Sequence, residues 1–112
     1  MTTPTFDHDG YPTEETLQAI REWPHTDFAG LILFAKEAFE GGQSYGWFIN
    51  EPSRIRPVFD AGFEDDGKWW RCATGGWSGC ESVIGALEKN DIFWFACWRA
   101  SLRGGYYEFH VD

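Results

Sequence analysis

Aromatic side chains constrain this chain more than any other feature of its sequence. Seven Trp, ten Phe and four Tyr occur among the 112 residues. Each such ring buries about 150–250 Å² when it enters a core, so a few of them fill the interior of a small domain. This composition excludes the disorder that low hydrophobicity causes. The length fits one domain, so we expect residues 1–112 to form a single domain after an irregular lead-in over residues 1–11.

Helical periodicity is found in three segments, residues 13–23, 26–40 and 78–89. Thr13 is the predicted N-cap of the first helix, and Pro24 ends it. The second helix carries apolar residues three and four positions apart, which is typical of an amphipathic helix. Ser78 and Glu81 fit a capping box, so the third helix is predicted to begin at Ser78.

Strand signals occupy five segments, residues 45–49, 55–64, 68–73, 92–101 and 106–111. The pair Asp66-Gly67 predicts a hairpin between the second and third of these, and Pro57 puts the second at a sheet edge. Residues 93–98 are apolar on both alternating faces, which predicts a central strand covered on both sides. The predicted fold class is α+β, with the order α-α-β-β-β-α-β-β and helices packed on a largely antiparallel sheet.

Acidic charge is concentrated in the first half of the chain. The net charge is −9, and residues 1–51 hold nine acidic against two basic residues, whereas residues 52–112 hold nine against seven. Binding to nucleic acid or to an anionic membrane needs clustered positive charge, so neither is expected. The acidity either solubilises the domain or forms a negative surface for a basic protein partner.

Three cysteines, Cys72, Cys80 and Cys97, leave at least one thiol unpaired, and no two of them form a CxxC pair. Neither they nor the three histidines have zinc-ligand spacing, so we expect no metal and no cofactor. The N-terminus lacks the basic and apolar parts of a signal peptide, and no apolar run reaches the length of a membrane span. These features predict free thiols in a bacterial cytoplasm.

A glycine-rich segment precedes the third predicted helix. Such a turn can expose backbone N–H groups to an anion. It lacks the lysine of a phosphate-binding loop, does not fit GxGxxG, and has Cys80 where a GxSxG nucleophile elbow requires glycine. Two interpretations stay open. One is a tight strand-to-helix turn, and the other is a ligand-holding loop formed by Thr74, Gly75, Gly76, Trp77 and Ser78.

Residues 69–111 contain a pattern of glycine, aromatic and charged residues: TGGWSG at 74–79, Glu81, FW at 93–94, CW at 97–98 and RGGY at 103–106. In this pattern the chain resembles small hypothetical proteins that are common in bacteriophage and prophage genomes. That group has no established activity, so the resemblance assigns no functional residue. It implies a short, acidic accessory protein of phage type.

Three hypotheses for function follow, in order of preference. The first is a non-catalytic protein that binds a basic host or phage protein, such as a nucleic-acid-binding host-defence factor, by mimicking nucleic acid. Its acidic helical face would comprise Glu14, Glu15, Glu22, Asp27, Glu37 and Glu40. The second is a small enzyme or ligand-binding domain with a pocket at Gly75–Ser78. The third is a virion assembly module that associates with itself through an exposed edge strand or aromatic patch.

Overall fold

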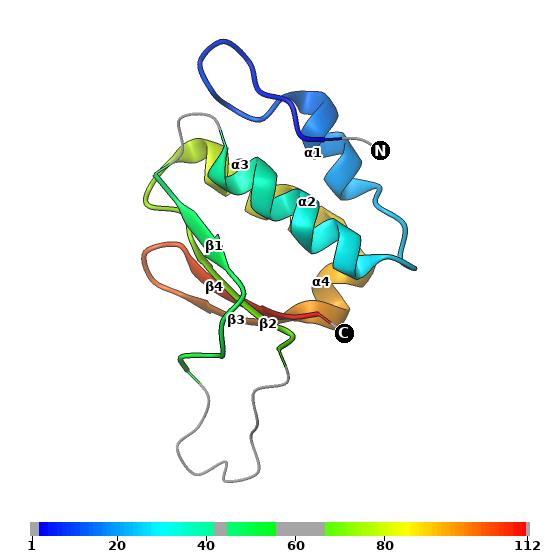
Figure 1. The fold of residues 1–112 in the computed structure, drawn as a ribbon, viewed down its shortest axis with the longest axis vertical. Helices are drawn as coiled ribbons and strands as arrows, with labels where there is room; N and C mark the ends of the chain where they lie inside the picture. The colour runs from blue at the N-terminus through cyan, green and yellow to red at the C-terminus, as the bar shows by residue number, and fades with distance from the viewer. Residues whose placement is uncertain (1–2, 42–44, 56–66, 112) are drawn as a thin grey trace, which may run out of the picture.

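A computed structural model describes residues 3–41, 45–55 and 67–111 of the chain. In these residues the chain forms an antiparallel β-sheet with helices packed on one face, so the predicted α+β class is confirmed (Figure 1). The elements are, in order, α1 (Glu14–Arg21), α2 (Phe28–Glu40), β1 (Trp47–Ile49), β2 (Trp69–Ala73), α3 (Ser78–Lys89), α4 (Asp91–Cys97), β3 (Trp98–Leu102) and β4 (Tyr106–His110). No helix in the described ranges has both the length and the apolar character that crossing a membrane requires.

The strands lie in the order β1-β2-β4-β3, and all neighbouring strands are antiparallel. Helix α2 packs on β1 and α3, while α1 packs on α3 and α2 and lies farthest from the sheet (Figure 1). Because successive residues of a strand point to opposite faces, one sheet face meets the helices and the other does not. Helix α1 packs mainly on α3 and α2, so it forms the outer layer on the helical side of the molecule.

Aromatic rings fill the space between the helices and the sheet, as the composition predicts. Phe48 and Phe109 are both fully buried, and their rings stack with centroids 6.2 Å apart. Phe39 of α2 meets Phe48 edge-on at 5.3 Å, and Phe93 of α4 lies 5.7 Å from Phe109. One contiguous core therefore joins the helices to the sheet.

The predicted central strand over residues 92–101 is wrong in its first half. Residues 91–97 form α4, and only β3 follows, at the edge of the sheet. Asn90 explains the difference, because its side-chain oxygen accepts a hydrogen bond from Phe93 N–H and caps the helix. Its amide also donates to the carbonyl of Ile20 at 3.0 Å, which ties the end of α1 to the α3–α4 junction. In the helix, Phe93 and Cys97 are buried four residues apart.

The predicted bounds of α3 are confirmed, but its predicted capping box is wrong. Trp77 occupies the N-cap position and forms no side-chain capping bond, while Ser78 is the first helical residue. Thr13 and Asp27 cap α1 and α2 with their side chains. The caps of α1 and α2 follow the preference of helix N-termini for side-chain oxygen acceptors. Helix α3 begins without such an acceptor.

Two further expectations concern the connecting segments. Ile55 lies outside any strand, and residues 56–64 of the predicted strand fall outside the described residues. The lead-in is more ordered than expected, since Phe6 and Pro12 form a β-bridge. Thr5 N–H donates to the hydroxyl of Thr16 at 2.8 Å, which attaches this segment to α1.

The β3–β4 turn packs closely against the loop that follows β2. Gly105 has φ +76°, and a Cβ added there would lie 2.2 Å from the Thr74 hydroxyl oxygen. Gly104 has φ +85°, but a Cβ there would meet nothing within 4 Å. We expect Gly105→Ala to lower the free energy of unfolding by about 2 kcal/mol or more, because strain and a clash act together. Gly104→Ala should cost only about 1 kcal/mol from its left-handed backbone. Equal losses in urea unfolding would refute this packing.

Candidate functional site

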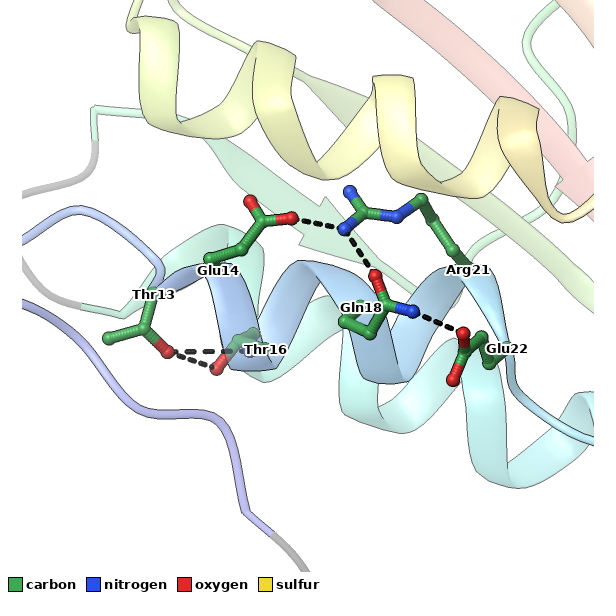
Figure 2. Close-up of polar contacts among 6 residues, drawn as sticks. All are labelled: Thr13, Glu14, Thr16, Gln18, Arg21 and Glu22. Atoms are coloured by element: carbon green, nitrogen blue, oxygen red, sulfur yellow. Dashed lines mark hydrogen bonds and ion pairs between the residues drawn. The ribbon is translucent and has the colours of Figure 1, made fainter.

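Glu14 and Glu22 take part in a row of polar contacts along α1 (Figure 2). Arg21 forms an ion pair with Glu14 and also donates to the side-chain oxygen of Gln18 at 2.7 Å. The Gln18 amide donates in turn to Glu22. The single cation of α1 is thus held within its own helix, where its charge offsets that of Glu14.

Two other residues of the predicted acidic face have roles in the fold. Asp27 accepts hydrogen bonds from Gly30 N–H at 3.0 Å and from the Trp23 indole at 3.2 Å. Glu40 pairs with Lys36 at 2.7 Å, and its other carboxylate oxygen accepts Phe48 N–H at 2.8 Å. These carboxylates stabilise the start of α2 and the edge of β1 respectively, so their charges are partly used within the molecule.

Glu15, Glu22 and Glu37 are exposed, and we call them the acidic helical surface. Glu15 and Glu22 are seven residues apart, which puts them on one side of α1 two turns apart. Glu15 also borders a small hollow that Phe34 of α2 lines, and Glu37 follows Phe34 by about one turn. The three carboxylates therefore lie on adjoining helices, two at α1 and one on α2.

The basic side chains near the acidic helical surface already form ion pairs within their own helices. Residues 3–41 contain eight acidic and two basic residues. Both basic side chains, Arg21 and Lys36, pair with acidic residues of their own helices. The acidic helical surface therefore has no neutralising Lys or Arg within residues 3–41, and it projects a negative field into solvent.

The glycine-rich segment forms a compact turn. Trp77 N–H donates to the Thr74 carbonyl at 3.1 Å, with Gly75 and Gly76 both at positive φ between them. The Trp77 indole is only 9% exposed, and it stacks on Tyr11 with centroids 5.1 Å apart and planes 9° from parallel. Thr74 is buried, whereas Gly75, Gly76 and Ser78 are exposed. The ring at the centre of the predicted ligand loop therefore packs against the N-terminal segment.

A second polar cluster, which the sequence did not predict, lies on the sheet face away from the helices. Glu108 of β4 is 0% exposed. Its carboxylate accepts hydrogen bonds from the Ser53 hydroxyl, from Arg54 N–H at 2.8 Å and from the Tyr106 hydroxyl at 2.5 Å. These bonds hold the segment that follows β1 across the centre of the sheet.

Arg71 of β2 lies opposite Glu108 in the strand register and is also buried. It pairs with Glu51, and its guanidinium carbon lies 5.6 Å from the centre of the Trp47 ring. Burial by itself lowers the pKa of Arg71, but bonds with Tyr106 and Glu51 raise it, and the net direction is upward. Arg71 Nε is buried without a hydrogen-bond partner in the structure. The one sequence signal for this cluster is a single charge of opposite sign at the centre of each aromatic strand.

All three thiols are buried, and burial raises the pKa of Cys72. Unfolding exposes this thiol to water, where it ionises near a pKa of about 8.5. Because the folded pKa is the higher one, the stability that the neutral thiol contributes is complete below the unfolded pKa and is lost as the pH rises above it. We expect the free energy of unfolding to fall above about pH 9, by up to about 1.4 kcal/mol per pH unit for this group. Chemical unfolding at several pH values should show a smaller fall in Cys72→Ala, and an equal fall would exclude Cys72 as the cause.

The described residues contain no group of three or more His, Cys, Asp or Glu side chains placed to hold a metal ion. Comparison with known proteins gives no match to a family model, to a curated protein or to a solved structure.

Proposed function

We propose that this chain is a non-catalytic binding protein that uses the acidic helical surface to bind a basic protein. The observation that supports this is the pairing of both cations of residues 3–41 inside their own helices. Charge left without counter-ions on an outer layer attracts a partner of opposite sign and speeds association with it. Asp7 and Asp9, in the exposed N-terminal turn, add to the same negative field.

The partner fits the class of proteins that handle nucleic acids. Such proteins carry Lys and Arg in grooves shaped for a negatively charged backbone. A row of carboxylates on adjoining helices offers a similar charge pattern on a rigid support. Together with the resemblance to phage-encoded proteins, this favours an accessory protein that occupies the nucleic-acid groove of a bacterial host or phage protein.

A pull-down from bacterial lysate tests the proposal. The tagged chain is loaded at about 50 mM salt and washed at about 500 mM, because added salt shortens the range of interactions between exposed charges. We expect a basic, nucleic-acid-binding protein to bind at low salt and to elute at high salt. Added double-stranded DNA should compete with the chain for this protein. Recovery of only salt-resistant partners, or of none, would contradict the proposal.

A further inference from the structure

The two edge strands of the described sheet differ in whether side chains form hydrogen bonds with their outer backbone groups. At the β1 edge, Glu40 accepts Phe48 N–H and the ammonium of Lys36 donates to the Phe48 carbonyl. A partner strand would have to displace both side chains, so α2 closes this edge. At the other end of the described sheet, β3 pairs with β4 on one side only. An edge strand of this kind presents backbone donors and acceptors to another chain.

Apolar side chains flank the open edge. Phe95, in the helix that runs directly into β3, is 90% exposed, and Leu102 at the far end of β3 is 50% exposed. Ile92 lies three residues before Phe95 on α4 and is also exposed. A phenylalanine that projects into water gains free energy when a partner covers it, so aromatic anchors of this kind mark binding patches.

The charge around β3 is opposite to that of the rest of the chain. Residues 92–107 contain no Asp or Glu but include Arg99 and Arg103, in a chain whose net charge is −9. The Arg99 guanidinium donates to the carbonyls of Ala96 and Trp98 at 2.9 and 3.0 Å, which holds its charge beside the start of β3. Arg103 is exposed just after β3 ends. Arg99 therefore lies at the register shift near the start of β3, and Arg103 lies four residues later, just past the end of the strand.

We propose that the outer edge of β3 binds an extended acidic segment of a partner protein, which adds to the sheet as a further strand. Backbone hydrogen bonds to β3 supply part of the affinity, and side chains on alternate positions supply specificity. Two carboxylates four residues apart match the spacing of Arg99 and Arg103, and an apolar residue between them covers Leu102. The part of the segment that continues past Arg99 reaches toward Phe95 at the end of α4. A second copy of this chain fits less well, because pairing two β3 strands would bring four arginines together.

Titration with a short peptide tests this site, with amide NMR signals as the readout. The probe is the capped peptide GEVTVEG, and its control is GKVTVKG, which has the same apolar residues and the opposite charge. We expect the acidic peptide to bind at least tenfold more tightly, to shift the amides of β3 and α4, and to slow hydrogen exchange in Ala100–Leu102. Equal affinity for the two peptides, or shifts confined to α1 and α2, would overturn the proposal.

Variants separate the edge from general charge effects. Arg103→Glu and Phe95→Ser should each weaken binding of the acidic peptide by fivefold or more, about 1 kcal/mol. Lys89→Glu and Leu33→Ser are matched controls, since these exposed residues lie on α3 and α2, and they should leave the affinity unchanged. Equal losses in the control variants would overturn the assignment to β3. Concentration-dependent pairing of β3 without peptide would overturn it in favour of a second copy.

Discussion

Glu108→Ala is expected to lower the free energy of unfolding by about 3 kcal/mol, because it removes a buried charged acceptor from three partly buried hydrogen bonds. The carboxylate is 0% exposed, and it is the acceptor for the Ser53 hydroxyl, Arg54 N–H and the Tyr106 hydroxyl. Hydrogen bonds to a charged group contribute about 1.5–3 kcal/mol each, and hydration of the partly exposed donors after the substitution recovers much of that. The segment after β1 should also detach from the sheet.

Urea unfolding followed by tryptophan fluorescence measures the effect. Glu88→Ala is the matched control, since it removes an exposed carboxylate from α3, and it should cost less than about 0.5 kcal/mol. Hydrogen exchange should accelerate at Arg54 N–H in the Glu108 variant. A loss below about 1 kcal/mol would mean that water replaces the carboxylate easily, and that the cluster does not hold this segment.

Reversal of the acidic helical surface is expected to reduce affinity for a basic partner by at least a hundredfold. The variant carries Lys at Glu15, Glu22 and Glu37, and the expected loss corresponds to about 2.7 kcal/mol of binding free energy. These side chains are exposed, and none of them holds the fold together as Asp27 and Glu40 do. The variant should therefore fold normally, which a thermal melt can verify. Its affinity for the protein recovered from lysate can be measured by isothermal titration.

A charge-matched variant separates the position of the charges from their number. Reversal of Glu81, Glu88 and Asp91 to Lys changes the same number of exposed acids on α3 and α4. Since each reversal adds two positive charges, both variants move from −9 to −3. We expect the second variant to lose less than tenfold in affinity. Equal losses would show that the partner responds to net charge and not to the helices α1 and α2.

The sequence predicted the helices and the sheet class well because their signals are local. The Thr13 cap, the periodicity of residues 28–40 and the adjacent aromatics at the start of β2 and of β4 each depend on a few neighbouring residues. The strand prediction for residues 92–97 was wrong because this aromatic run has high strand propensity. The segment forms a helix because Asn90 caps it and because its buried residues lie four positions apart. The Asn90 side chain is itself held by a contact 70 residues away, with the Ile20 carbonyl, which local sequence signals do not reveal.

The candidate surfaces were predictable only in part. Net charge and its uneven distribution are visible in the sequence, and they predict an acidic face on the N-terminal helices. Which carboxylates serve the fold depends on contacts across the chain, such as Glu40 with Phe48. The Glu108 cluster could not be predicted, because two of its three donors come from a segment about 55 residues away.

The salt dependence of the dissociation constant tests the central proposal most directly. The wild-type chain and the protein it captures would be titrated between about 50 and 500 mM salt, a range over which exposed charges become strongly screened. We predict that log Kd rises steadily with log salt concentration, and that the variant with Lys at Glu15, Glu22 and Glu37 loses most of this slope. A dissociation constant that stays the same across the range would contradict binding through the acidic helical surface.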